Sequence, residues 1–472
     1  MIESVAHITL TGSDLTLDQV CAVARDGALV DLDPAALEAM ARARAVVERA
    51  VADGEPAYGV TTGVGSRKSF DADAAGHDRL LVRQHRISQG APVPHEVVRG
   101  TALRLANALA RATTVARPEL AVHLVAALND DRLPEIRVLG SIGQSDLAQM
   151  ADLADGFLGD FELARGEAIT LLNQSAFATA YGALAFSDAL VLLDALDYAG
   201  ALDLEALGAN RNSVHPAIGV ARPYPGLQAT LARLGELLEG SEVSGRDLQD
   251  PLTFRTIAQQ NGACRDAFGF VSSQLGIELN AAQSNPLVLV DEGRVISVGN
   301  FEVQPLATAL DLARLALAPV ISTAAERAVK LLQAPLTGLT EGLGERPAMA
   351  ESALSEYGIA IQAIAVEARL LAQPVSYDLM STTQAEGIED RMTMAPLAAR
   401  RLAEMVELGA RVVAIELMFA AQACDLRGVR IGRGTDSLRS KVRAFVPFLA
   451  AGDTLTDLEP LVCEIRSGRL VR

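Results

Sequence analysis

Two polar side chains have the chemistry to bind a small molecule. Arg255 could hold a carboxylate through two parallel hydrogen bonds, and its alternative role is an ion pair with the nearby Asp250. Asn173 lies in an apolar stretch, where an unpaired amide is costly. It is therefore either a hydrogen-bonded core amide or a donor in a site, and we favour the site.

Two further side chains could transfer protons. Tyr58 opens the glycine-punctuated segment 58–65. A tyrosine acts as a base only if nearby cations or donors lower its pKa from about 10, and Arg255 could supply that charge. Glu389 could be a buried acid or base. The alternatives are a surface tyrosine at position 58 and an ion pair between Glu389 and Arg391.

The histidines and cysteines do not predict a metal site. The chain has six histidines, without the spacing of metal ligands. Its four cysteines are far apart and show no paired spacing, which predicts neither a disulfide framework nor a zinc site. We expect a protein of the reducing cytoplasm, because the first residues also lack the basic and apolar regions of a secretory signal.

The composition favours a soluble helical protein. The chain has 472 residues, of which 50% are hydrophobic and 4% aromatic, so its interior is built from Ala, Leu and Val. The net charge of −18 disfavours a nucleic-acid partner, which would need a basic face. Residues 168–187 carry no charge, but polar residues interrupt them, among them Asn173, Gln174 and Ser175. We therefore predict a buried helix there and no membrane span.

The hydrophobic pattern divides the chain into three consecutive regions. Residues 1–190 mix strands, turns and helices, with a strand expected at Ile8–Leu10. Residues 191–427 follow a helical period and predict a central bundle. Its helix over 396–425 would span roughly 45 Å and is expected to pack between subunits. Residues 428–472 form a short helical tail. The predicted fold class is mainly α.

Several segments, in order from about Tyr58 to Arg427, resemble the aromatic amino acid ammonia-lyases and aminomutases. The segment 58–65 is similar to that family's mobile tyrosine loop, Tyr-Gly-Ile-Asn-Thr-Gly-Phe-Gly. Residues 249–255 resemble Gln-Asp-Pro-Tyr-Ser-Leu-Arg, and 388–394 resemble Gln-Glu-Asp-His-Val-Ser-Met. The resemblance implies a mixed α+β N-terminal region, a long helical bundle and a homotetramer.

The resemblance breaks at the family's reactive loop. In the family an Ala-Ser-Gly triplet cyclises to the methylidene-imidazolone electrophile, MIO. Here Gln144-Ser145 stands in its place, followed by Asp146. Ring closure needs a very tight turn, which glycine tolerates and a residue with a Cβ resists. We predict that MIO is absent and that the protein has no cofactor.

The resemblance also implies roles for individual residues. Those of Tyr58, Asn173 and Glu389 are catalytic. The substrate contacts are assigned to residues at matching or altered positions: His85, Gln144, Asp146, Leu252, Arg255, Phe301 and Glu302. His85 matches a substrate-selecting histidine of histidine lyases, and its alternative is a solvated surface histidine.

Several changes from the family pattern fall around the altered loop. Besides Leu252 and Glu302, which replace a tyrosine and a histidine, they are Gln149, Gln304 and Arg391. Asp146 could be an acid with a raised pKa, or it could cap the helix that follows it. Because a decaying site would lose costly buried polar groups, their retention favours a rebuilt one.

The sequence is compatible with three functions. The first is an MIO-independent enzyme performing acid–base elimination, addition, isomerisation or cyclisation on a carboxylate-bearing small molecule. The second is a non-catalytic binding or scaffold homologue, and the third is an ordinary MIO ammonia-lyase. In a tetramer, Tyr58, Arg255 and Glu389 are expected to come from different subunits.

Overall fold

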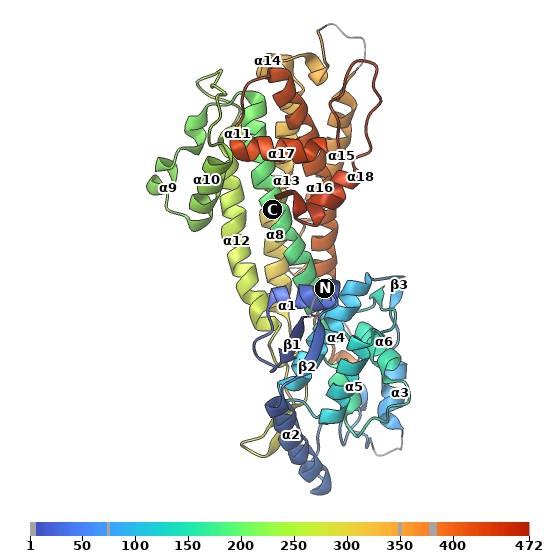
Figure 1. Cartoon of the computed structure of the whole chain (residues 1–472). Helices are drawn as coiled ribbons and strands as arrows, with labels where there is room; N and C mark the ends of the chain where they lie inside the picture. The colour runs from blue at the N-terminus through green and yellow to red at the C-terminus, as the bar shows by residue number, and fades with distance from the viewer. Residues whose placement is uncertain (1–5, 73–75, 348–351, 377–384, 472) are drawn as a thin grey trace. The chain divides into compact units, whose positions relative to one another are not determined.

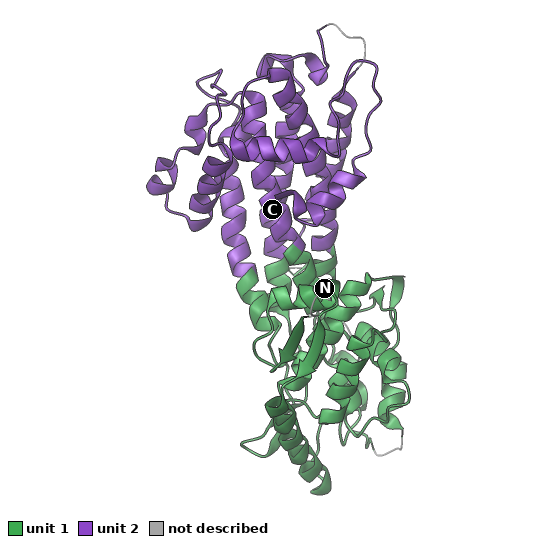
Figure 2. Cartoon of the chain, viewed as in Figure 1, with its two compact units in different colours: residues 1–187, 272–310, 374–400 green, residues 188–271, 311–373, 401–472 purple. Residues whose placement is uncertain are grey.

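The computed structural model describes residues 6–72, 76–347, 352–376 and 385–471. Within them the chain is mainly helical, as predicted, with three small two-stranded sheets (Figure 1). It forms two compact units, each made of discontinuous segments (Figure 2). Unit 1 comprises residues 1–187, 272–310 and 374–400, and unit 2 comprises 188–271, 311–373 and 401–472. The sequence-based division was into consecutive regions, whereas this one groups segments that contact each other.

Four long helices contribute residues to both units. They are α8 (Ala176–Leu207), α12 (Ile257–Glu278), α13 (Gln304–Leu331) and α16 (Ala395–Arg427). The stretches Glu167–Leu207 and Gln304–Leu331 are long and apolar enough to cross a membrane, but 72% and 61% of their most apolar windows are buried. That burial is what core helices of a folded protein show.

Unit 1 holds the strands and the shorter helices of the N-terminal region. Its elements are β1 (His7–Leu10), α1 (Leu17–Arg25), β2 (Leu29–Leu32), α2 (Pro34–Ala52), η1 (Gly65–Arg67), α3 (His77–Gln84), β3 (Gln89–Pro92), α4 (His95–Ala110), α5 (Pro118–Asn129), β4 (Arg137–Leu139), α6 (Leu147–Leu158), α7 (Glu167–Leu172), β5 (Leu287–Leu289), β6 (Arg294–Ile296) and η4 (Ala385–Gly387). The strand expected at Ile8–Leu10 is confirmed as β1, which pairs in parallel with β2. The pairs β3–β4 and β5–β6 are antiparallel.

Unit 2 is a helical bundle with a C-terminal helical segment. Its further elements are η2 (Arg211–Val214), α9 (Ala217–Ala221), α10 (Pro225–Leu237), α11 (Leu252–Arg255), α14 (Ala334–Thr337), η3 (Glu341–Leu343), α15 (Ser355–Leu370), α17 (Arg433–Arg443), α18 (Glu459–Arg466) and η5 (Arg469–Val471). Gly409 lets α16 approach α8 and α13, because a Cβ there would lie 2.5 Å from Leu192 and 2.9 Å from Ile321.

A buried ionic cluster joins three helices of the unit 2 bundle. Arg327 on α13 donates to Asp203 on α8 at 2.7 Å and to Glu416 on α16 at 2.6 Å. All three side chains are buried. Burial raises the pKa of Asp203 and the neighbouring Glu416 raises it further, while Arg327 lowers it.

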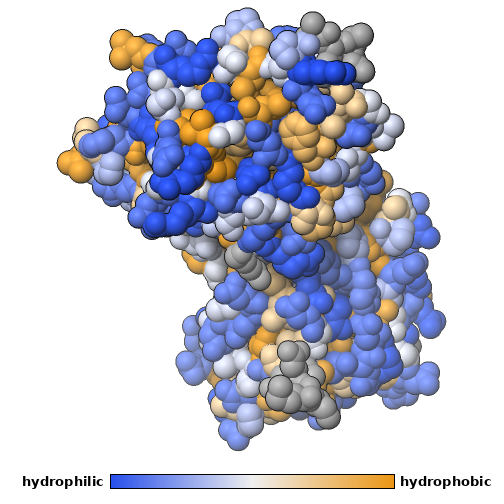
Figure 3. Space-filling view, turned by 45° about the horizontal axis from the view of Figure 1, so that its top comes forward, coloured by the Kyte–Doolittle hydropathy of each residue, from blue (hydrophilic) through white to orange (hydrophobic). Residues whose placement is uncertain are grey.

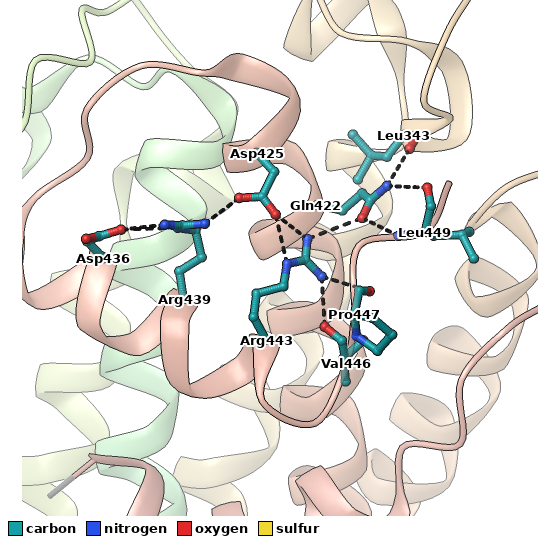
Figure 4. Close-up of polar contacts among 9 residues, drawn as sticks. All are labelled: Leu343, Gln422, Asp425, Asp436, Arg439, Arg443, Val446, Pro447 and Leu449. Carbon is teal, nitrogen blue, oxygen red and sulfur yellow. Dashed lines mark hydrogen bonds and ion pairs between the residues drawn. The ribbon is translucent and has the colours of Figure 1, made fainter. Parts of the chain in front are cut away.

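Polar contacts also hold the C-terminal segment on the bundle (Figure 4). Asp425 near the end of α16 accepts hydrogen bonds from Arg439 at 2.6 Å and from Arg443 at 2.8 Å, both on α17. Gln422, one turn earlier, donates to the carbonyl of Leu449 at 3.0 Å and accepts from its N–H at 3.1 Å. Residues after Arg427 are therefore an integral part of unit 2.

Helix α16 is confirmed, but its expected environment needs correction. Most of its apolar side chains in unit 2, from Leu402 to Cys424, are already buried by their own chain. Packing between subunits is therefore not needed to cover them. The uncovered apolar surface lies on other helices, and apolar patches stand among the polar residues of the face in Figure 3.

We expect the protein to be a tetramer in solution, because α15 exposes apolar side chains that another subunit would cover. Ile359, Val366 and Leu370 are 70%, 43% and 69% exposed and recur along one helix, which is unfavourable in water. Light scattering of the purified chain should give four times the chain mass. A stable monomer across a tenfold dilution would contradict this prediction.

Candidate functional site

The altered loop Gly140–Asp146 connects β4 to α6 in unit 1. Gly143 and Ser145 have positive φ angles of 79° and 59°. A Cβ at Gly143 would lie 2.2 Å from the Thr393 hydroxyl, so the close approach of Thr393 requires glycine. Thr393 donates to the Gly143 carbonyl at 2.7 Å, and its N–H donates to the Ile142 carbonyl at 3.1 Å. The segment that follows Glu389 therefore holds this loop in place.

Asp146 is at the centre of the loop's hydrogen bonds. It is the N-cap residue of α6 by position, but its side chain does not cap that helix. Its carboxylate instead accepts from the Ser141 hydroxyl at 2.9 Å and from the Ala178 N–H, in the first turn of α8, at 2.8 Å. The alternative of a cap for the following helix is thus wrong. Asp146 caps α8, because the fold brings that helix end to the loop.

Burial raises the pKa of Asp146 to about 6, although the hydrogen bonds from Ala178 and Ser141 lower it. The carboxyl is fully buried and faces the positive end of α8, and burial outweighs these donors. A carboxyl group with this pKa can accept and release a proton near neutral pH.

Asn173 contacts the loop directly. The Ser145 hydroxyl donates to its side-chain oxygen, and its NH₂ group donates to the Asn285 carbonyl at 3.0 Å. The carbonyl of the next residue, Gln174, accepts the Asp146 N–H at 2.8 Å. Asn173 is therefore both a hydrogen-bonded core amide and a neighbour of the altered loop.

Four of the altered positions form one hydrogen-bonded network. The Gln144 amide donates to Glu302 at 2.7 Å, and Arg391 forms an ion pair with the same carboxylate at 3.1 Å. Arg391 also donates to the Gln304 side chain at 3.1 Å, and the Gln304 N–H donates to Glu302 at 2.9 Å. The sequence offered Glu389 as an alternative partner for Arg391, but in the structure Arg391 pairs with Glu302. Residues that differ from the family pattern thus contact one another.

Phe301 precedes this network and is half-buried. Its carbonyl accepts the Ser175 hydroxyl at 3.3 Å, which ties the end of the 299–301 segment to the residues just after Asn173. Phe301 is placed beside Glu302 at the loop.

Tyr58 and Glu389 lie close enough to influence one another. The Tyr58 hydroxyl accepts the Gly65 N–H at 3.0 Å. Burial raises the pKa of Tyr58, the Gly65 hydrogen bond lowers it, and the charge of Glu389 raises it further. Tyr58 is therefore a neutral phenol near pH 7 and keeps its hydroxyl proton. The condition for a basic tyrosine, a lowered pKa, is therefore not met, because burial and the nearby anion prevail.

One chain supplies both of these residues. A Cβ at Gly65, at the end of the tyrosine loop, would contact Ala385 at 3.6 Å, so the two segments are adjacent. The prediction that Tyr58 and Glu389 come from different subunits is wrong in this respect.

His85 ends α3 and is half-buried. Its Nδ1 lies 2.8 Å from the carbonyl of Leu81 in the same helix. If Nδ1 carries the proton of that hydrogen bond, Nε2 is the nitrogen that can meet a ligand.

Leu252 and Arg255 belong to α11 in unit 2 and are not part of the unit 1 cluster. Leu252 is 65% exposed. Asp250 accepts the Asn210 N–H at 2.7 Å, and no ion pair joins it to Arg255 among the described residues. The Arg255 Nε is buried and has no hydrogen-bond acceptor in the described part of the chain. A buried N–H without an acceptor favours a ligand at this half-buried arginine over the alternative of a structural ion pair.

Three residues of the loop environment escaped the sequence-based site. Ser141 and Ser145 bind Asp146 and Asn173, and Gln174 is fully buried with neither amide atom paired among the described residues. The serines lie in the altered loop itself, which was the available signal. The contact between Gln174 and Asp146 depends on the tertiary fold, which no local sequence pattern reveals.

Comparisons with known proteins agree with this architecture. The profile of the aromatic amino acid lyase family matches residues 15–164 and 157–444. A histidine ammonia-lyase of Deinococcus radiodurans is 35% identical over 97% of this chain and 94% of its own length. A histidine ammonia-lyase of Symbiobacterium thermophilum is also 35% identical, over 98% and 97%.

Solved structures show the same fold. An ergothioneine-degrading ergothionase from Treponema denticola, in complex with desmethyl-ergothioneine sulfonic acid, matches with a TM-score of 0.91 and 27% identity. It covers 98% of this chain and 99% of its own. The histidine ammonia-lyase of Trypanosoma cruzi matches with a TM-score of 0.89 and 27% identity, over 98% and 94%.

Proposed function

This chain belongs to the aromatic amino acid lyase family, and we propose that it is an enzyme of that scaffold that works without MIO. Its reaction would be an acid–base elimination, addition, isomerisation or cyclisation on a carboxylate-bearing small molecule. The observation that carries the proposal is the network of altered residues, in which Gln144, Glu302, Gln304 and Arg391 contact one another at the loop. Such mutual pairing supports a rebuilt polar site.

The residues at the loop do not fit the MIO group. Ring closure would require the nitrogen of Asp146 to attack the carbonyl of Gln144, and that N–H is held by the Gln174 carbonyl at 2.8 Å. The Asp146 side chain is fixed by Ser141 and Ala178, which opposes the tight turn. We therefore route no step through an electrophilic cofactor.

The chain's own groups supply an acid–base alternative. Tyr58 would donate a proton and Glu389 would accept one, since the two lie near each other in unit 1. Asp146 adds a second carboxyl with a pKa of about 6. Asn173 would stabilise developing negative charge, helped by the N-terminus of α8.

Arg255 would hold the substrate carboxylate and would be contributed by a neighbouring subunit. Its buried, unpaired Nε supports an anionic ligand. The related ergothionase carries a ligand with a sulfonic acid group, which is a second reason to expect an anion. His85 and Phe301 would contact the rest of the substrate.

A second candidate is an ordinary histidine ammonia-lyase. Relatives at 35% identity carry that name, and His85 matches the position where histidine lyases carry histidine. This reading requires Gln144-Ser145-Asp146 to cyclise, so the two candidates differ in the mass of the chain.

We expect the intact mass of the purified protein to equal the encoded mass. Mass spectrometry of the whole chain and of the peptide spanning residues 137–149 checks this, with a histidine ammonia-lyase as the positive control. A deficit of two waters within the peptide would establish the second candidate. In parallel, L-histidine, L-phenylalanine and L-tyrosine should release no ammonia. Ergothioneine and other carboxylate-bearing small molecules should be screened for turnover and for binding.

A further inference from the structure

A cleft of about 600 Å³ opens on unit 1, apart from the loop network described above. It is lined by six polar residues: Arg83, Arg86, Ser88, Arg137, Asp152 and Asp155. Its volume is in the range of small-molecule sites, which run from about 300 to 1,000 Å³. The walls come from α3, from the segment between α3 and β3, from β4 and from α6.

The aspartates of the cleft are shared among several arginines. Asp155 lies 2.6 Å from Arg86, 3.3 Å from Arg79 and 3.7 Å from Arg83. Asp152 lies 3.6 Å from Arg86. Each guanidinium has five N–H donors, so the two carboxylates satisfy only part of them.

Two of the arginines are held loosely enough to turn to a ligand. The Arg83 side chain is 63% exposed and lies 3.7 Å from Asp155, a long distance for an ion pair. Arg137 is exposed and donates one N–H to the Gly90 carbonyl at 2.8 Å. With Arg79 and Arg86 they place four positive charges against two negative ones, in a chain whose net charge is −18. This local excess of positive charge attracts anions.

We propose that this cleft binds a small oxyanion carrying at least two negative charges, either a phosphate or a polycarboxylate. Forked guanidinium groups bind both chemistries through paired hydrogen bonds. Arg83 and Arg137 would bind the anion, and Asp152 and Asp155 hold Arg86 in position between them. The site is separate from the one under the proposed function and does not depend on it.

The cleft adjoins both ends of the altered loop. Gln149, one of the altered positions, donates to the carbonyl of Arg137 at 3.1 Å. A Cβ at Gly140 would lie 3.2 Å from the Cα of Ser88, so the loop begins in contact with the cleft wall. An anion bound there would therefore protect α3, β4 and the start of α6 from hydrogen exchange.

Calorimetric titration of the full-length protein with inorganic phosphate, citrate and adenosine monophosphate tests this inference, with chloride at matched ionic strength as the reference. We expect saturable binding of at least one of them, and at least a tenfold loss of affinity in the double variant Arg83→Gln/Arg137→Gln. The control Arg132→Gln removes an exposed arginine of the same unit and should keep the wild-type affinity.

The three probes separate a phosphate site from a polycarboxylate site. Thermal unfolding of each variant checks that the fold is kept, and the single variant Arg83→Gln serves if the double variant is unstable. Binding that matches chloride, binding unchanged in the variants, or protection from exchange outside residues 77–158 would each overturn the proposal.

Discussion

Tyr58→Phe and Arg255→Ala should each reduce turnover of the substrate by about a hundredfold or more, with the fold kept. Loss of a positioned proton donor typically costs 10²- to 10⁴-fold in rate. Phenylalanine keeps the ring of Tyr58 and removes only the hydroxyl, which accepts the Gly65 N–H. The expected loss of stability is therefore only about 1 kcal/mol. Alanine at position 255 should weaken binding of the carboxylate, because the guanidinium is its proposed partner.

Matched variants separate these roles from general effects. Tyr224→Phe removes the hydroxyl of an exposed tyrosine, and Arg433→Ala removes an exposed arginine of unit 2 that pairs with Glu239. Both controls should retain turnover and ligand affinity. If Tyr58→Phe and Arg255→Ala also behave as wild type, the active-site assignment fails. The alternative of a non-catalytic binding or scaffold protein is then favoured. Circular dichroism and thermal unfolding of all four variants show whether a loss of activity reflects unfolding.

The long helices could be predicted from sequence because their signal is local. An apolar pattern continuing from 396 to 425 identifies α16 within two residues at either end. The partners that bury it could not be predicted, since Leu192 and Ile321 are far from Gly409 in sequence. This is why α16 was expected to pack between subunits, whereas most of its apolar side chains are buried by its own chain.

The partners of the candidate site residues were harder to predict than the helices. The motif around Glu389 suggested Arg391 as its neighbour, yet Arg391 pairs with Glu302, 89 positions away. For Tyr58, a basic role required a lowered pKa, but burial dominates and no local pattern reports burial of a loop residue. For Asp146, the N-cap preference correctly predicted a capping side chain but the wrong helix. The side chain caps α8, which the tertiary fold brings to the loop.

Asp146→Asn should change how the free energy of unfolding depends on pH. The pKa of Asp146 is about 6 in the folded protein, against an ordinary value of 3.8. Because the folded pKa is raised, the protonated side chain contributes its full stability below about pH 4. That contribution is lost as the pH rises through 6. A shift of about two pKa units corresponds to roughly 3 kcal/mol.

Asparagine at position 146 does not titrate and can still accept a hydrogen bond from Ala178. The difference in unfolding free energy between variant and wild type should therefore move in favour of the variant by about 2 kcal/mol from pH 4 to pH 8. Urea denaturation of both proteins at several pH values measures this difference. The comparison cancels other buried acids with raised pKa values, such as Asp78 and Glu278. Parallel curves for the two proteins would show that Asp146 ionises at its ordinary pKa in the fold.

The activity of the same variant then separates the two roles of Asp146. If its carboxyl transfers a proton, Asp146→Asn should gain stability relative to wild type as the pH rises and yet lose turnover by about a hundredfold. If the carboxyl only caps α8, asparagine caps about as well and turnover should persist. A buried catalytic acid combines both properties. Burial moves its pKa toward neutrality, which the reaction needs, and the same burial destabilises the fold when the group is ionised.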